Sequence, residues 1–466
     1  FMPNFLYNPF RLPATTKLTM DKQRPIIAAS ESDDELSAFL KSGIYRFENA
    51  NACFIDPVRV LNRSYTRFKV SGSAYYSRFF HASEISLANH SNEAPKNSKK
   101  RKRSEKKKKK GQTLNSREQM ADQRHQEVRP ALLKAHEALL GTTQLLEALR
   151  DLRNDFENCN GESISKGSEV DFVEIGGVWQ APFYEIVLKH HEDDTTVETA
   201  GVESCCQTAL PVFSNLVANE GSLEIEAELL GHQYILPKRS SFYMSDFTNA
   251  LFLVMRKSDL SQIHNLIPAD SDCGFNLIMI DPPWENSSAR QKQKYRTLPN
   301  RYFLSLPIKQ LAHIAGALVG LWVTNREKLW NFVENELFPK WGVKHAATFY
   351  WLKVRPDGLL ISELDLFHHR PYECLILGFS QGKEMNSEQL LSLKRIPDNQ
   401  IFISVPGDYS RKPPIGEFLL EHVLGFKPAR CIELFSREMM PGWTSWGNEP
   451  LHFQDSKYFL QATDNL

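Results

Sequence analysis

The residues best suited to chemistry are Asp281, Pro282, Pro283 and Trp284, which directly follow the apolar run 277–280. Because ligands of open α/β sheets bind beyond the carboxyl ends of the strands, Asp281 is expected at a binding edge. Prolines fix φ near about −65° and lack an N–H, so the turn is predicted to be rigid, with carbonyl oxygens free to accept. Trp284 offers a flat face for stacking. An acid, a fixed acceptor and an aromatic plane together favour a planar amine, such as N6 of adenine, as the ligand.

This set of groups fits alkylation of an adenine amine. The amine lone pair is delocalised into the ring, and two acceptors that hold both N–H bonds keep the nitrogen more pyramidal while a methyl group approaches in line. Alkylation acidifies the N–H, so Asp281, with an ordinary pKa of about 3.9, need not be a strong base. The alternative is a strand that simply ends in a proline turn. An acid, two prolines and a tryptophan after a strand form a much rarer pattern, which favours function.

The elements that must hold this turn lie in the second half of the chain. From about residue 212 to the end, strand and helix patterns alternate, as they do in an α/β domain. Helices are predicted over 326–338 and 414–424. Strands are predicted at 277–280, 320–325, 349–354, 373–378, 402–405 and 431–435.

The first half mixes helical and strand patterns. A capped helix start is predicted at 30–40, and residues 129–156 form an amphipathic helical pattern that is interrupted near 141–143. Residues 59–70 alternate as a strand whose basic and aromatic face could hold RNA, although an ordinary solvated face is the more frequent cause of this pattern. A hairpin is predicted to turn at Gly176–Gly177.

The net charge of zero hides one strongly basic run. Residues 96–110, KNSKKRKRSEKKKKK, hold eleven Lys or Arg against one Glu, so the remaining chain is mildly acidic. Two basic clusters in a low-complexity segment predict a nuclear localisation signal, with a solvated linker as the alternative. The seven cysteines contain no CxxC pair, which argues against a zinc finger or a disulfide framework and fits a reducing compartment. No apolar run approaches the roughly 18 residues of a membrane span.

Several motifs resemble one enzyme family. DPPW is similar to the signature of the adenine-N6 methyltransferases of the MT-A class, and the likeness covers residues 205–466 closely and the first half only loosely. The motifs RPYE, KPP and PGWTSWGNE resemble those of the methyltransferase-like-four branch in particular. The likeness continues through LWVTNR (321–326), WLKV (351–354), HHRPYECLILG (368–378), SVPGDYSRKPP (404–414) and IELFSREMMPGWTSWGNE (432–449).

The resemblance implies S-adenosylmethionine as the methyl donor, bound without a glycine-rich fingerprint. It implies that Lys412 meets the donor carboxylate, that Asp281 belongs to both the catalytic and the donor site, and that Glu449, where the messenger-RNA enzymes carry Gln, meets the ribose hydroxyls. The full set implied for the donor is Asp246, Phe247, Asp281, Lys412, Phe435, Arg437, Asn448 and Glu449. The set expected to meet the nucleic acid is Arg290, Lys292, Lys294, Arg296, Arg370, Ser410 and Arg411. No metal site is expected.

The fold expected is α/β, a Rossmann-like S-adenosylmethionine-dependent methyltransferase domain with permuted motif order, preceded by an N-terminal α+β region. The resemblance implies a nuclear RNA adenine-N6 methyltransferase that acts on an internal 2′-O-methyladenosine of U2 small nuclear RNA. A DNA adenine-N6 methyltransferase and a non-catalytic RNA-binding scaffold are the alternatives, and the intact Asp281 counts against the scaffold. RNA is the expected partner, no membrane is, and a monomer is favoured over a heterodimer. The predicted regions are 1–95 (α+β), 96–115 (basic linker), 116–165 (helical), 166–211 (β-rich) and 212–466 (methyltransferase).

Overall fold

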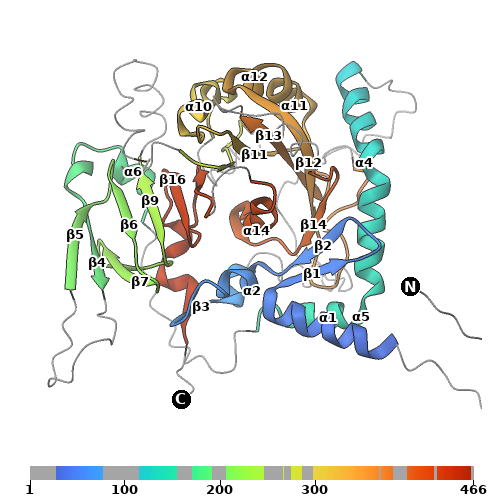
Figure 1. The fold of residues 1–466 in the computed structure, drawn as a ribbon, viewed down its shortest axis with the longest axis horizontal. Helices are drawn as coiled ribbons and strands as arrows, with labels where there is room; N and C mark the ends of the chain where they lie inside the picture. Colours follow the sequence, from blue (N-terminus) through green and yellow to red (C-terminus); the bar gives the residue numbers. More distant parts are fainter. Residues whose placement is uncertain are drawn as a thin grey trace, which may run out of the picture.

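The structure is a computed structural model, and its central feature is one large mixed sheet (Figure 1). No helix in the described part of the chain is both long and apolar enough to cross a membrane. The residues described are 28–76, 115–154, 170–190, 206–245, 266, 274–285, 297–366, 369–380, 396–423 and 428–462.

Within these residues, eleven strands form the sheet in the order β1-β2-β14-β12-β13-β11-β10-β15-β16-β9-β6. Its middle, from β11 through β10, β15 and β16 to β9, is parallel, and β13 runs antiparallel between β11 and β12. The predicted α/β class is confirmed. The strands are β1 (Ile44–Phe47), β2 (Ala52–Ile55), β6 (Leu216–Asn219), β9 (Ser240–Met244), β10 (Leu277–Ile280), β11 (Ala317–Val323), β12 (Val343–Lys353), β13 (Tyr372–Ser380), β14 (Ile401–Ser404), β15 (Cys431–Leu434) and β16 (Trp443–Gly447).

The continuous apolar runs of the sequence become the centre of this sheet. All four residues of β10 and all seven of β11 are buried, as expected for parallel strands that are covered on both faces. Each of the six strands predicted in the second half is present, and 277–280 agrees residue for residue. The helix predicted at 326–338 is also present, as α11 (Glu327–Phe332), a π-helical turn at Val333–Leu337 and α12 (Phe338–Trp341). The prediction at 414–424 corresponds to the shorter α14 (Gly416–Leu420).

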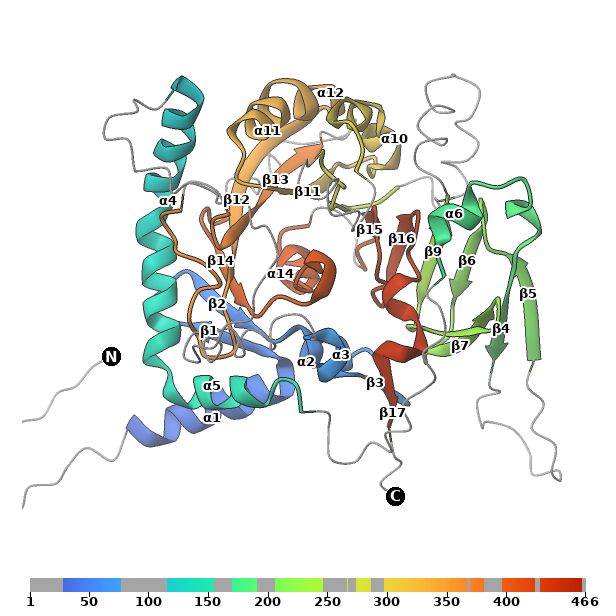
Figure 2. The same cartoon turned by 180° about the vertical axis from the view of Figure 1, so that it is seen from behind.

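The long amphipathic pattern forms α4 (Ser116–Gly141), which packs against β14, β2, β1 and α11. Figures 1 and 2 show it running along one side of the molecule. Its buried stripe includes Val128, Leu132 and Leu139. The helix ends at Thr142 and α5 (Thr143–Ala148) follows, so the interruption predicted near 141–143 is confirmed. The helix predicted from 30–40 is also present, as α1 (Ala28–Ser42).

Two predictions for the first half are wrong. The alternating stretch 59–70 begins inside α2 (Pro57–Asn62), because the Asp56 carboxylate caps the helix by accepting from the N–H groups of Val58 and Arg59. Only β3 (Phe68–Val70) is a strand. The expected hairpin at Gly176–Gly177 is instead the end of α6 (Phe172–Gly176), which Asp171 caps. In both places an aspartate directly before the segment favours a helix over the alternation pattern.

The N-terminal and C-terminal parts share one sheet and one core. Strand β2 pairs in parallel with β14, so β1 and β2 extend the large sheet at one end (Figure 2). Strand β3 pairs with β17 (Phe459–Gln461) near the end of the chain. At the opposite side, β4 (Glu185–His190), β5 (Cys206–Pro211), β7 (Ile225–Leu229) and β8 (His232–Leu236) form a separate antiparallel sheet. The predicted regions 1–95 and 212–466 are thus joined by strand pairing.

Candidate active site

Asp281 lies at the carboxyl end of β10, between the parallel strands β11 and β15. Its carboxylate is 3.1 Å from the Nζ atom of Lys412. The Asp281 side chain retains 20% of its exposure, and both residues line one pocket. The carboxylate is therefore accessible from a cavity, and Lys412 lies beside it.

The turn after Asp281 is held by hydrogen bonds that correct one prediction. The Pro282 carbonyl accepts from the Trp284 N–H at 2.7 Å, and the Pro283 carbonyl accepts from the Leu298 N–H at 3.0 Å. The sequence predicts that both carbonyls are free to accept, whereas each already has one N–H donor from the protein. Each carbonyl oxygen has two lone pairs, so each keeps one for a further donor. The turn is rigid because of these bonds as well as its prolines.

Trp284 fixes the turn more than it offers a stacking surface. Its indole is 8% exposed, and its Nε1–H donates to the Trp322 carbonyl at 2.8 Å. The ring packs edge-on against Phe303, with a centroid distance of 4.9 Å. The predicted flat face for an incoming base is thus mostly covered by the protein's own side chains.

Lys412 links Asp281 to a second acid that the sequence reasoning missed. Its Nζ atom is 3.4 Å from Glu373 as well as 3.1 Å from Asp281, and Glu373 also forms an ion pair with Lys353. Burial lowers the pKa of Lys412, but the two carboxylates outweigh it and the net pKa is raised. Burial raises the pKa of Glu373, but Lys353 and Lys412 bring it down to about 2. Lys412 and Glu373 are therefore charged at neutral pH, and the alternation of acidic and basic side chains stabilises the cluster.

The signal for Glu373 and Lys353 was present in the sequence. Both residues stand in otherwise apolar strand patterns, 373–378 and 349–354, within the motifs RPYE and WLKV. Charged residues in buried strands need partners of opposite charge, so such a pair predicts a site or a buried ion pair.

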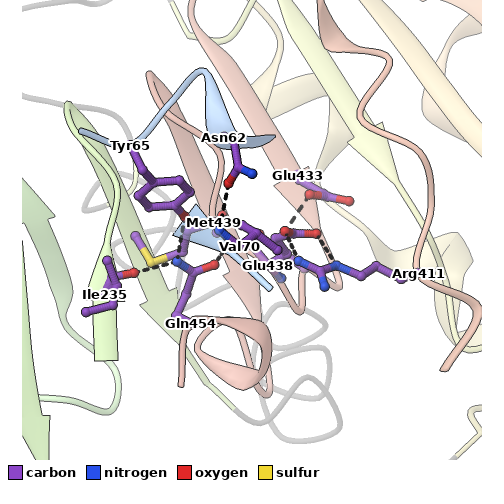
Figure 3. Close-up of polar contacts among 11 residues, drawn as sticks. Asn62, Tyr65, Val70, Ile235, Arg411, Glu433, Glu438, Met439 and Gln454 are labelled. Carbon is purple, nitrogen blue, oxygen red and sulfur yellow. Dashed lines mark hydrogen bonds and ion pairs between the residues drawn. The ribbon is translucent and has the colours of Figure 1, made fainter. Parts of the chain in front are cut away.

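Arg411 points away from this cluster. Its guanidinium forms a two-pronged ion pair with Glu438 (Figure 3), with the Nε–Oε2 distance 2.8 Å, and its side chain is 4% exposed. The rings of Tyr75 and Phe453 each lie 4.3 Å from its guanidinium carbon. The prediction that Arg411 contacts nucleic acid is corrected: its charge is paired inside the protein, next to the pocket.

Gln454 joins this part of the site to two distant segments. Its amide nitrogen donates to the Ile235 carbonyl at 2.5 Å and to the Tyr65 hydroxyl at 3.2 Å, and its oxygen accepts from the Met439 N–H at 3.1 Å (Figure 3). Gln454 is fully buried. The N-terminal segment, the small sheet and the loop after β15 therefore meet at a single side chain.

The residues expected around the donor are distributed along this edge. Phe435 and Arg437 line the pocket with Asp281 and Lys412, and Phe435 adopts φ +62°, which turns the chain sharply after β15. Asn448 and Glu449 follow the carboxyl end of β16, and the Glu449 carboxylate is 3.7 Å from His452. Their contacts with a donor remain predictions.

The two remaining described residues of the nucleic-acid set behave differently. The Ser410 carbonyl accepts from Lys412 at 3.3 Å, so Ser410 lies next to a residue that lines the pocket. Arg370 is turned toward α4, where its guanidinium donates to the Ala121 carbonyl at 3.1 Å and lies 3.6 Å from Asp122. With 5% exposure it cannot steer a phosphate backbone, and that prediction is corrected.

Some predicted site residues lie outside the described residues, together with the basic run 96–110. These are Asp246, Phe247, Arg290, Lys292, Lys294 and Arg296. Among the described residues, no group of three or more His, Cys, Asp or Glu side chains is arranged to hold a metal ion.

Comparison with known proteins places the pocket inside a recognised domain. Residues 275–449 match the MT-A70 family. The mouse protein named N(6)-adenine-specific methyltransferase METTL4 is 38% identical over 259 residues, which cover 54% of this chain and 50% of the mouse protein. The chain spans about half the length of the curated relatives it matches first.

Two more distant relatives have names that point to different nucleic acids. The Cryphonectria parasitica protein named N6-methyladenosine RNA methyltransferase MTA1 is 33% identical over 196 residues, covering 40% of this chain and 55% of that protein. The Caenorhabditis elegans protein named DNA N6-methyl methyltransferase is 31% identical over 237 residues, covering 50% of this chain and 57% of that protein. Asp281, Lys412, Glu373 and Phe435 all fall within the matched domain.

Proposed function

We propose that the chain belongs to the MT-A70 family, in its METTL4 branch, and that it methylates N6 of adenine with S-adenosylmethionine as the donor. The observation that carries the proposal is the contact between Asp281 and Lys412 at the carboxyl end of β10. Asp281, whose carboxylate would hold the adenine amine, and Lys412, whose ammonium would hold the donor carboxylate, are adjacent there. This adjacency supports a site where the adenine and the donor meet.

The chemistry of the pocket fits this donor. An amino-acid carboxylate needs a fixed cation, and Lys412 is charged, buried and held by two acids. Its ammonium has three N–H donors, which point to Asp281, Glu373 and, at 3.3 Å, the Ser410 carbonyl, so a donor carboxylate would take the place of the bond to Ser410. When bound, the donor supplies a methyl group on a positively charged sulfur. Phe435 and Arg437 provide an aromatic and a cationic wall in the same pocket.

Asp281 then orients the amine that is methylated. The Asp281 carboxylate lies 3.1 Å from Lys412 and accepts an N–H of the adenine amine. The remaining lone pair of the Pro282 or Pro283 carbonyl accepts the other N–H, at a position that the turn fixes. The proton lost on alkylation passes to solvent, because the methylated amine is acidic. Asp281 contributes positioning and electrostatic stabilisation rather than strong basicity.

The substrate proposed is RNA, with an internal 2′-O-methyladenosine of U2 small nuclear RNA as the target. The sequence motifs that resemble those of the METTL4 branch support this choice. The basic run 96–110, which we take as a nuclear localisation signal, supports it as well. DNA adenine is the second candidate, favoured by the name of the nematode relative. The N-terminal segment packs into the site through Tyr75, which supports a monomer as the active form.

The test is methyl transfer from labelled donor to three oligonucleotides of one sequence: RNA, RNA with a 2′-O-methyl on the target adenosine, and DNA. We expect the highest rate on the 2′-O-methyl RNA, and loss of methylation on all three for Asp281→Asn, with donor binding retained. Asp357→Asn, at an exposed acid that pairs with Arg355, is the matched control and should keep full activity. Turnover by Asp281→Asn near the wild-type rate would refute the role of Asp281, and a preference for DNA would select the second candidate.

A further inference from the structure

The pocket contains a second carboxyl group, Glu433, that the mechanism above does not use. Glu433 lies on β15 and pairs in register with Met279 of β10, two residues before Asp281. Side chains of residues that pair in register on neighbouring strands point to the same face of a sheet, so Glu433 and Met279 share a face. Glu433, Phe435, Met279 and Asp281 all line the same pocket. Two carboxyl groups therefore face one cavity from neighbouring strands.

The two carboxyl groups differ in their partners. Asp281 has Lys412 at 3.1 Å, whereas no Lys, Arg or His in the described part of the chain forms an ion pair with Glu433. The Ser436 hydroxyl donates a long hydrogen bond to the Glu433 Oε2 atom, at 3.4 Å. A partly buried carboxylate with one long hydrogen bond and no ion-pair partner is costly unless a ligand supplies the opposite charge.

The surroundings keep Glu433 neutral while the pocket is empty. Burial raises its pKa most, Asp281 and Glu438 raise it further, and the Ser436 hydrogen bond and Arg437 lower it, which leaves the pKa at about 8. Asp281 comes from the end of β10, and Ser436, Arg437 and Glu438 come from the segment after β15. At pH 7 most molecules therefore carry a proton on Glu433, and a cation in the pocket would favour its release.

We propose that Glu433 is the specificity residue by which the pocket distinguishes the positively charged sulfonium donor from the neutral thioether product. The inference rests on the proposed function. The nitrogen that Asp281 holds must lie next to the donor's methyl group during transfer, so the sulfonium is brought close to Asp281. Glu433, one strand away at the same cavity, is then near enough for its charge to act through a poorly solvated space.

The proton balance follows the reaction. On donor binding, Glu433 releases its proton to solvent and faces the sulfonium as a carboxylate. During transfer the S–CH3 bond breaks, its electron pair stays on sulfur, the N6–CH3 bond forms, and the amine loses one proton to solvent. The product sulfur is neutral, so Glu433 takes a proton back from solvent. The carboxylate loses its partner at that moment, which weakens retention of the product relative to the donor.

The test is calorimetric binding of S-adenosylmethionine and S-adenosylhomocysteine at pH 7, in two buffers of different ionisation enthalpy. Wild-type protein is expected to release more protons with the donor than with the product. Its donor affinity should rise with pH between about 6.5 and 8, while the product affinity stays flatter. The α-amino group of the donor titrates in the same range, so the variant Glu433→Gln is the necessary reference.

Glu433→Gln keeps the shape of the side chain and removes its charge. The difference in proton release should shrink, and donor affinity should fall about tenfold while product affinity changes little. Glu417→Gln, at a surface acid paired with Arg63, is the control and should match wild type. Equal losses for both ligands, or an unchanged difference in proton release, would overturn the inference and assign Glu433 to a contact shared by donor and product. Wild-type protein that binds neither ligand would overturn the proposed function as well.

Discussion

Arg411 and Lys412 are adjacent in sequence, yet they form ion pairs on opposite sides of their loop. Arg411 pairs with Glu438, and Lys412 pairs with Asp281 and Glu373. The backbone between them is held from both sides, so the position of Lys412 depends on the fit of Arg411 between Tyr75 and Phe453. Three parts of the chain that are far apart in sequence thus fix one catalytic-site lysine.

Arg411→Met should lower the free energy of unfolding by about 3 kcal/mol, because it leaves Glu438 buried without its partner. Because the loop is loosened, the KM for the donor should also rise more than the KM for the oligonucleotide. Urea denaturation and initial-rate kinetics measure these two effects. The double variant Arg411→Met/Glu438→Gln should regain part of the lost stability, since the unpaired charge is gone. A double variant no more stable than the single one would show that lost packing, rather than the ion pair, causes the effect.

Glu373 should make stability sensitive to acid. Its pKa is depressed to about 2 in the folded protein, so its stabilising contribution is complete above the unfolded pKa near 4.5. That contribution is lost as the pH falls from there toward 2. The difference in unfolding free energy between wild type and Glu373→Gln should therefore be largest at neutral pH and shrink across this window. Denaturation at a series of pH values measures it. A difference that does not change with pH would contradict the ion pairs assigned to Glu373.

Gln454→Met should lower the free energy of unfolding by about 2 kcal/mol. The substitution keeps the length of the side chain but leaves the Met439 N–H and the Ile235 carbonyl without their partner in a buried place. Gln123→Met on the exposed face of α4 is the matched control, with an expected change within about 0.5 kcal/mol. Equal effects of the two variants would mean that the Gln454 contacts contribute little to stability.

The sequence allowed the fold around Asp281 to be predicted because periodicity is a local property. The apolar runs that became β10, β11 and β15 are readable from a few neighbouring residues. Stretch 59–70 failed because its alternation competed with the Asp56 cap, whose hydrogen bonds decide the conformation. A capping residue directly before an alternating stretch therefore indicates a helix more strongly than the alternation indicates a strand.

The site was predictable only as far as its motifs reach. The motifs place Asp281 and Lys412 in one site, but the direct ion pair between them was not predicted. Arg411 pairs with Glu438 and packs against Tyr75, and the Pro283 carbonyl accepts from Leu298. These contacts depend on how segments that are distant in sequence pack together. The same holds for Arg370, because no feature near it in the sequence indicates that α4 packs over its side chain.

The pairing of β2 with β14 sets a condition for any shortened version of the protein. A chain that began after residue 76 would lack β2, and the row of N–H and C=O groups along β14 would face water without a neighbouring strand. An unpaired edge strand of this kind can pair with strands of other molecules, so the shortened protein should self-associate. It would also lack Tyr75, whose ring packs against Arg411. Its soluble fraction would therefore have low activity because Arg411 is poorly held, and not because contacts with nucleic acid are lost.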